Sequence, residues 1–116
     1  PMSSKTHSLG RLKKRSEFLY VRDGRYKAIG GVVIQSRANP DAGDHIRAGF
    51  TATKKIGNAV IRNRAKRRLR EAAREKLPEL GRKGYDYVFI ARQSTLQRGY
   101  EDLLKDVEKA LLSLTS

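Results

Sequence analysis

The chain has 116 residues, which is enough for one domain with a single core and too few for two. It carries 26 Lys and Arg against 12 Asp and Glu, a formal net charge of +14, and a domain with that charge repels itself unless a polyanion neutralises it. Nucleic acid is therefore the expected partner, with an anionic membrane surface as the second choice. The absence of cysteine excludes disulfides and thiolate metal sites, and together with the lack of a membrane-length apolar run it predicts a cytoplasmic protein.

The first part of the chain predicts an arm, a short helix and a strand. Residues 1–15 are polar and basic, and we interpret them as a partly mobile N-terminal arm ahead of a single domain over 16–116. Ser16 can cap a helix that Gly24 ends. Residues 28–37 are rich in β-branched side chains and predict one strand, in which Gly30 and Gly31 weaken the pairing or admit close packing.

A loop over 38–44, dense in turn residues, leads to a second predicted strand from His45 to about Thr53. Its residues alternate in character, so one face is expected to meet the core. The core face would hold Ile46, Ala48, Phe50 and Ala52, and the other face Arg47, Gly49, Thr51 and Thr53.

The second half of the chain predicts a long helix, a strand and a last helix. Asn58 is a suitable N-cap for the long helix, and Pro78 is expected to end it. Residues 85–92, YDYVFIAR, predict a strand, and residues 99–114 repeat apolar side chains at helical spacing. The order α-β-β-α-β-α predicts an α+β fold, a two-layer α-β sandwich of one sheet with helices.

The long helix and its entry carry most of the functional signal. From Lys54 to Arg74, nine side chains are basic and one is acidic in 21 positions. At ~100° per residue the apolar side chains form one narrow stripe, which comprises Ile61, Ala65, Leu69, Ala72, Ala73 and the aliphatic part of Lys76. Arg outnumbers Lys in the helix, and a guanidinium pairs bidentately with phosphate and stacks on bases. The pattern favours nucleic-acid binding, and the thin, alanine-rich stripe disfavours a membrane surface.

The sequence indicates no catalytic group of its own. Metal-dependent phosphodiester cleavage needs converging carboxylates, and the acidic residues here are scattered over separate elements. The two histidines, His7 and His45, are far apart in the chain, and no Gly-rich phosphate loop followed by Lys-Ser or Lys-Thr is present. We therefore expect no catalytic residue and no metal site in the protein. Phe18 and Tyr20, on a short helix that buries one face, are candidates to stack on unpaired bases.

The segment TKKIGNAVIRNRAKRRLRE (53–71), which follows a strand ending GFTAT and precedes a strand ending FIAR, resembles the protein subunit of bacterial ribonuclease P. The Arg-Asn-Arg signature of that family is present as Arg62, Asn63 and Arg64, and RLKKRSEF (11–18) and the final leucine-rich helix occur in the family's order. The resemblance implies a ribosomal protein S5 domain 2-like sandwich with a left-handed β-α-β crossover, which the general preference for right-handed connections would not predict.

The resemblance also implies a function. With a catalytic RNA, the protein would form an endoribonuclease that removes the 5′ leader of precursor tRNA by hydrolysis. The RNA would carry the catalysis, and the protein alone would be inactive. Magnesium would be bound mainly by the RNA and the substrate, and neither a membrane nor a small-molecule substrate is implied. The alternative is a ribosomal protein or ribosome-assembly factor that binds ribosomal RNA, which shares the size, charge and architecture and is separated only by the helix motif.

Carried over by position, the resemblance assigns two sets of residues. Those expected to bind the catalytic RNA are Lys54, Lys55, Asn58, Arg62, Asn63, Arg64, Lys66, Arg67, Arg68 and Arg70. Those expected to bind the leader, in a cleft between the first helix and the sheet, are Phe18, Arg22, Ile34, Thr51, Thr53, Arg62, Asn63 and Arg92. The sequence departs from the family at two places. Arg22 stands where many members have an aromatic, and Ile34 or Gln35 stands where they have a tyrosine, so a guanidinium would partly replace stacking.

Overall fold

The computed structural model describes residues 9–115, and most of the predicted arm lies outside the described residues. In chain order the elements are β1 (Leu9–Arg11), α2 (Arg15–Arg22), β2 (Arg25–Ile29), β3 (Val32–Ala38), β4 (Ile46–Thr51), α3 (Ala59–Leu80), β5 (Tyr85–Ala91) and α4 (Tyr100–Thr115). Short 3-10 turns occupy Pro40–Ala42, Lys54–Ile56 and Gln93–Thr95.

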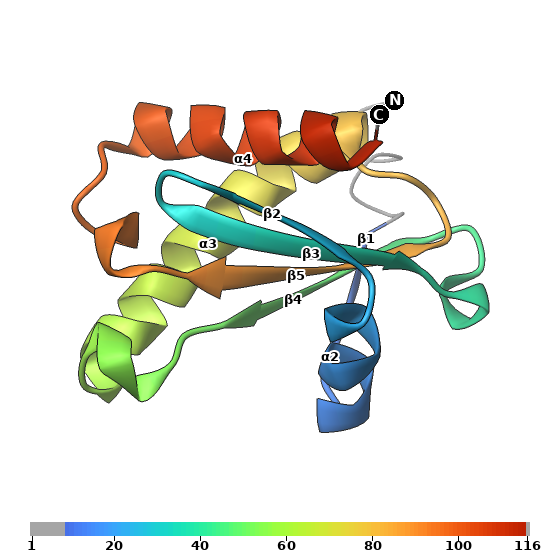
Figure 1. Ribbon diagram of the computed structural model, residues 1–116, viewed down its shortest axis with the longest axis horizontal. Helices are drawn as coiled ribbons and strands as arrows, with labels where there is room; N and C mark the ends of the chain where they lie inside the picture. The colour runs from blue at the N-terminus through green and yellow to red at the C-terminus, as the bar shows by residue number, and fades with distance from the viewer. Residues whose placement is uncertain (1–8, 116) are drawn as a thin grey trace.

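The five strands form one sheet in the order β1-β4-β5-β3-β2. β4 pairs in parallel with β1 and β5, whereas β3 runs antiparallel to β5 and β2. Figure 1 shows α3 and α4 on one face of the sheet and α2 on the other. The predicted α+β sandwich is therefore confirmed, and α3 connects the neighbouring parallel strands β4 and β5 as the predicted β-α-β unit requires.

Two hydrophobic clusters follow from this arrangement. The larger one fills the space between the sheet and α3 and α4, and the smaller one lies under α2, where Leu12, Val21 and Val88 are buried together. The predicted alternation along β4 is confirmed, because Ile46 and Ala48 belong to the larger cluster while the intervening residues face α2. Both faces of the sheet are thus covered in part, and α2 leaves a region of its own face open.

The single strand predicted over residues 28–37 is instead a hairpin. Ile29 of β2 pairs with Val32 of β3, which leaves Gly30 and Gly31 as a two-residue turn. Gly30 has φ +53°, a conformation that glycine adopts without strain and that tight hairpin turns use. A Cβ atom at Gly30 would also collide with the carboxylate of Asp106, which accepts a hydrogen bond from the Gly31 N–H at 2.9 Å. The two glycines therefore mark a turn that packs closely against α4.

The sequence does not predict the first strand. Leu9–Arg11 lies within the basic segment assigned to the arm, and it forms β1 by parallel pairing with Ile46–Ala48 of β4. Three residues are too few to show the alternating pattern that predicts a strand. Their pairing partner is also more than thirty residues away in the chain. The helix that follows begins at Arg15, one residue before the predicted cap Ser16.

The prediction that Pro78 ends the long helix is wrong, because α3 continues to Leu80. Proline removes one backbone donor and crowds the preceding turn, but in the last turn only a short piece of helix remains to be disturbed. The N-terminal cap is confirmed, since the Ile61 N–H donates to Asn58 Oδ1 at 3.0 Å. At the other end the Gly81 N–H donates to the Leu77 carbonyl at 2.7 Å and closes the helix.

The apolar stripe of α3 faces the sheet as predicted. Its buried residues are Ala65, Leu69, Ala72, Ala73 and Leu77, while Ile61 and Lys76 are half-buried at the margins. Arg64 and Arg67 are exposed on the opposite side. Within residues 9–115, no helix combines the length and apolar character needed to cross a membrane.

Truncation of the central stripe residue should cost stability. Leu69 is fully buried, so Leu69→Ala is expected to lower the free energy of unfolding by roughly 2–5 kcal/mol. Arg64→Ala, on the exposed side of the same helix, is the matched control and should change it by less than about 0.5 kcal/mol. Urea unfolding followed by circular dichroism measures both, and a larger loss for the Arg64 variant would mean that the helix is rotated relative to the sheet.

Candidate nucleic-acid interface

A groove of about 660 Å³ runs beside α2 on the face of the sheet opposite α3 and α4. Four of the predicted leader-binding residues meet there: Phe18 and Arg22 from α2, Thr51 from β4 and Thr53 just beyond it. Phe18 and Arg22 are four residues apart, which places them one turn from each other on the same side of the helix. The groove thus combines an aromatic ring, a guanidinium and two hydroxyls among its lining groups.

Phe18 packs directly against the sheet at a position without a side chain. A Cβ atom at Gly49 would lie 2.6 Å from Phe18 Cζ and 2.7 Å from Cε2, closer than such atoms approach. Gly49 is therefore what allows the Phe18 ring to lie low over β4. The ring is half-buried, packs against the small cluster under α2 and still lines the groove.

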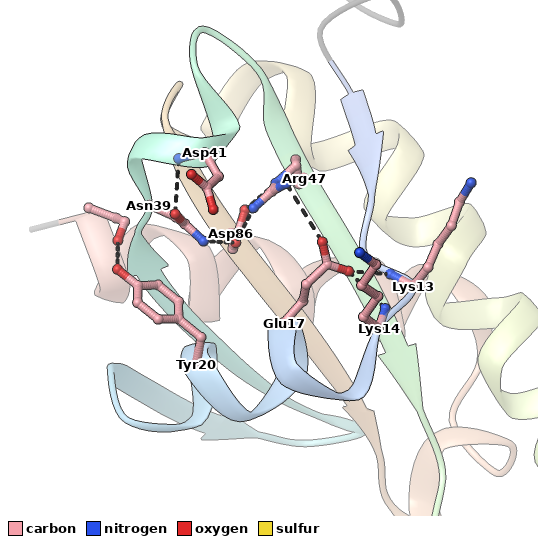
Figure 2. Close-up of polar contacts among 9 residues, drawn as sticks. Lys13, Lys14, Glu17, Tyr20, Asn39, Asp41, Arg47 and Asp86 are labelled. Atoms are coloured by element: carbon pink, nitrogen blue, oxygen red, sulfur yellow. Dashed lines mark hydrogen bonds and ion pairs between the residues drawn. The ribbon is translucent and has the colours of Figure 1, made fainter.

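A buried ion pair fixes the sheet beneath the start of α2 (Figure 2). Arg47 on β4 donates two hydrogen bonds to Asp86 on β5, from Nε at 2.7 Å and from Nη2 at 2.8 Å. Asn39 Nδ2 donates to the same carboxylate at 2.8 Å, and Asp86 is fully buried. Arg47 Nη1 also lies 3.8 Å from Glu17 Oε2 on α2. Charge on the sheet is thereby linked to the helix that forms one wall of the groove.

Glu17 closes the N-terminus of α2. Its Oε1 atom accepts hydrogen bonds from the backbone N–H groups of Lys13 and Lys14, both at 2.8 Å. These bonds, Lys14 first, hold the pKa of the Glu17 carboxyl below its ordinary value, and the Arg47 guanidinium lowers it further. The hydrogen bonds with Asp86 in turn raise the pKa of Arg47. The Glu17 carboxylate and the Arg47 guanidinium therefore both remain charged at neutral pH.

The far end of α2 is attached to β3. Tyr20 Oη donates to the Ala38 carbonyl at 2.6 Å, as Figure 2 shows, and Arg37 Nη1 donates to the Tyr20 carbonyl at 3.0 Å. The Arg37 guanidinium also lies 4.0 Å from the centre of the Tyr20 ring. Tyr20 is thus engaged on the side of α2 away from the groove, and of the two candidate stacking residues only Phe18 lines the groove.

Ile34 is not a groove residue. Its side chain is fully buried in the larger cluster on the α3 and α4 face of the sheet. Its neighbour Gln35 points to the other face and lines the groove, so Gln35 takes the position that the sequence left open between the two. A one-residue difference along a strand reverses the face, which is why residue spacing alone could not decide it.

The other predicted leader residues do not line the groove. Among the described lining residues, Arg62, Asn63 and Arg92 are absent. Arg92 lies just after β5, where its guanidinium donates to the Gly30 carbonyl at 3.3 Å. Two cations that the sequence had placed in the arm, Lys13 and Arg15, line the groove instead. The basic run before the helix is the signal for these two cations in the sequence.

The N-terminal half of α3 and its entry form a cationic surface. Its exposed members are Lys54, Lys55, Asn63, Arg64 and Arg67, and Arg62 and Lys66 are half-buried beside them. Asn58 contributes differently, because its side-chain oxygen caps the helix. Of the residues predicted to bind RNA, most therefore present their polar groups to solvent on one helix and its entry.

Arg68 and Arg70 are partly engaged within the protein. Arg68 Nη1 donates to the Thr95 carbonyl at 2.9 Å, and its guanidinium lies 6.0 Å from the Tyr100 ring. Burial, followed by a hydrogen bond to Glu75, raises the pKa of Tyr100 to about 12. Arg70 lies 5.5 Å from the Phe50 ring at the rim of a smaller hollow of about 240 Å³ between β1 and α3. These two arginines connect α3 to its neighbours in addition to adding charge.

Among residues 9–115, no three His, Cys, Asp or Glu side chains are grouped so that they could hold a metal ion. The buried carboxylates Asp86 and Asp106 are each paired with an arginine, at 2.7 and 2.9 Å. Their oxygens are therefore already engaged in the fold.

Together, the fold and its two surfaces define a small, basic α+β protein of the nucleic-acid-binding class. The family model of ribonuclease P matches residues 7–115, which is nearly the whole chain, and the chain belongs to this family. Membership of this family favours a subunit of ribonuclease P over a ribosomal protein or ribosome-assembly factor.

Curated relatives and solved structures agree with this assignment. A ribonuclease P protein component from Ruegeria pomeroyi is 53% identical over 106 residues, covering 89% of this chain and 84% of the relative. One from Caulobacter vibrioides is 51% identical over 117 residues, covering 99% and 78%. The structure of the RNase P protein from Thermotoga maritima matches with a TM-score of 0.75 at 27% identity, covering 89% of this chain and 96% of that one.

The charge of Glu17 should stabilise the α2 end of the groove in a pH-dependent way. Because its folded-state pKa is lowered from the ordinary value of 4.5, its contribution is present above that value and is lost as pH falls through the folded pKa. Glu17→Gln should reduce the free energy of unfolding at pH 7 by about 0.3–1 kcal/mol, the usual worth of a carboxylate at a helix N-terminus. The difference between the two proteins should disappear in acid.

Denaturant unfolding from pH 7 to pH 3 measures this difference. Glu71→Gln, which changes the net charge equally on an exposed part of α3, separates the local contribution from overall charge. A Glu17 difference that is the same at every pH would show that the carboxylate charge does not hold the helix.

Proposed function

We propose that this chain is the protein subunit of a bacterial ribonuclease P, a cytoplasmic ribonucleoprotein that removes the 5′ leader of precursor tRNA. The observation that carries the proposal is the placement of two separate surfaces in a member of this family. The cationic surface is on α3, which covers one face of the sheet, and the groove lies beside α2 on the other face. A protein that binds two RNA segments at once, a structured partner and a single-stranded leader, requires such a separation.

The α3 surface suits the catalytic RNA. Its exposed cations come from one rigid helix and the turn before it, and arginine forks recognise phosphates bidentately. The acidic residues of α4 lie mostly on another part of the molecule, where Glu101 and Asp102 begin that helix. A polyanion is therefore attracted to the α3 side and disfavoured near the start of α4.

The groove suits an unpaired leader. Single-stranded RNA is held by aromatic rings that stack on bases and by cations that follow the backbone. Phe18 supplies the ring, and Lys13, Arg15 and Arg22 supply charge along the same groove. Thr51, Thr53 and Gln35 add hydrogen-bonding groups on the floor. Phosphate contacts here are independent of base identity, so the groove accommodates many leader sequences.

The protein's own residues bind and orient the substrate in this proposal. The described residues offer no carboxylate cluster for magnesium, so we assign the metal ions and the hydrolysis of the phosphodiester bond to the catalytic RNA and the substrate. The protein would raise affinity for the leader and for the productive complex. In a cleavage assay with magnesium, the protein without RNA should leave precursor tRNA intact.

Loss of the Phe18 ring should weaken binding of precursor tRNA selectively. In the assembled complex, Phe18→Leu keeps apolar packing on Gly49 and removes the stacking surface. Affinity for precursor tRNA should fall by about 1–3 kcal/mol, the usual worth of a base–aromatic stack, while affinity for mature tRNA, which has no leader, stays unchanged. Equal losses for both RNAs, measured by equilibrium binding, would remove the groove from leader recognition.

Loss of an exposed α3 arginine should act on assembly instead. Arg64→Ala should weaken binding of the catalytic RNA and reduce the slope of log affinity against log salt by about 1, because one phosphate contact is lost. Lys109→Ala on α4 removes the same charge from an exposed position of that helix and is the control. A titration over salt concentration measures both, and equal effects of the two variants would mean that only net charge matters.

A further inference from the structure

Tyr26 is the most exposed large hydrophobic residue that the structure describes, at 69% of its possible area. It lies on β2, the edge strand of the sheet. An exposed aromatic ring gains nothing from the core, and single exposed apolar residues are common enough to need no function. Its position relative to the groove is what distinguishes Tyr26 from the others.

The strand register places Tyr26 in one row with groove residues. Tyr26 on β2 pairs with Gln35 on β3, Gln35 pairs with Val88 on β5, and Val88 pairs with Gly49 on β4. Directly paired residues point to the same face of a sheet, and Gln35 and Val88 both line the groove. Tyr26 therefore points to the groove face.

The neighbouring residues of β2 agree with this orientation. Arg25 points to the opposite face, where its guanidinium donates to the Leu114 carbonyl on α4 at 2.8 Å. Successive side chains of a strand alternate between faces, so Tyr26 faces away from α4. The helix α2 covers other parts of that face and leaves the Tyr26 ring open to solvent.

The two ends of the row carry the two aromatic rings. Phe18 lies against Gly49 at the β4 end, and Tyr26 stands on β2, three strand spacings or about 14 Å away. Gln35 lies in the row between them, and both Gln35 and Arg22 line the groove. A single-stranded RNA that entered the groove beside Phe18 and continued past Arg22 would pass over Tyr26 as it left the groove.

We propose that Tyr26 is a second base-stacking position for the leader, on the edge strand β2 just beyond the groove. The inference rests on the proposed leader-binding function and extends it from the walls of α2 to the edge of the sheet. Arg22 and Gln35 contact the backbone or base edges, and the ring that stacks lies one strand further out. The ligand at this position is an unpaired nucleobase of any identity, because every base has a π-face.

The test compares variants of Tyr26 in the assembled complex with precursor tRNAs whose leaders differ in length. Tyr26→Ala should weaken binding of a long-leader precursor by about 5- to 150-fold, the range that corresponds to one base–aromatic stack. Tyr26→Phe, which keeps the ring, should bind within about twofold of the unmodified protein. A leader too short to cross the groove should bind both proteins equally, and mature tRNA should as well. Leu112→Ala, at another exposed apolar position on α4, is the matched control and should have no effect.

A fluorescent base analogue places the two stacking positions separately. With 2-aminopurine at successive leader positions, stacking quenches the emission of the base that lies on the ring. Tyr26→Ala should restore emission at one position, and Phe18→Leu should restore it at a different one. A structural role for Tyr26 would not produce this pattern, and the midpoint of thermal unfolding should be unchanged in Tyr26→Ala because the ring is exposed.

The outcomes separate this inference from the function on which it rests. If Phe18→Leu weakens leader binding and Tyr26→Ala does not, the leader occupies the groove and the second stacking position is refuted. If Tyr26→Ala weakens precursor and mature tRNA equally, or lowers the unfolding midpoint to match its loss of binding, the inference is also overturned. If neither variant distinguishes precursor from mature tRNA, leader binding in the groove itself fails.

Discussion

The buried ion pair between Arg47 and Asp86 is the constraint on which the groove depends. A fully buried carboxylate is costly unless its oxygens are paired, and Asp86 meets that demand through Arg47 and Asn39. Arg47 then reaches Glu17, whose carboxylate closes the N-terminus of α2. The apolar face of α2 is small, so burial alone specifies its position weakly. The polar network fixes where the helix crosses the sheet, and Gly49 fixes how closely it approaches.

The charge of the chain is distributed in accordance with this architecture. Cations on α3 are exposed on the side of the helix opposite its apolar stripe. Arg47, Arg68 and Arg98, in contrast, are engaged in contacts that hold elements together. The net charge of +14 therefore overstates the number of cations available to a partner. Because some arginines are engaged within the fold, the count of basic residues predicts a polyanionic ligand but does not tell which arginines would bind it.

Several local features follow from the sequence, although the Ser16 cap and the helix end at Pro78 do not, and features that depend on distant pairing do not follow from it. The α3 cap at Asn58, its buried stripe and the alternation along β4 follow from residue spacing, and the structure has all three. The turn at Gly30 and Gly31 requires knowing that β2 returns to pair with β3, and β1 exists only because β4 lies beside it. In the groove, the resemblance groups Phe18, Arg22, Thr51 and Thr53, whereas choosing Gln35 over Ile34 requires the register.

The register also changes how the departures from the family pattern are understood. The resemblance implies that Arg22 and either Ile34 or Gln35 stand where aromatics line the proposed leader cleft. Counting across the sheet, Gln35 lies next to Tyr26, so aromatic surface is present one strand further toward the edge. Residues distant in sequence but adjacent in a sheet can exchange roles in binding an extended ligand, because such a ligand contacts a row of strands and not a single strand.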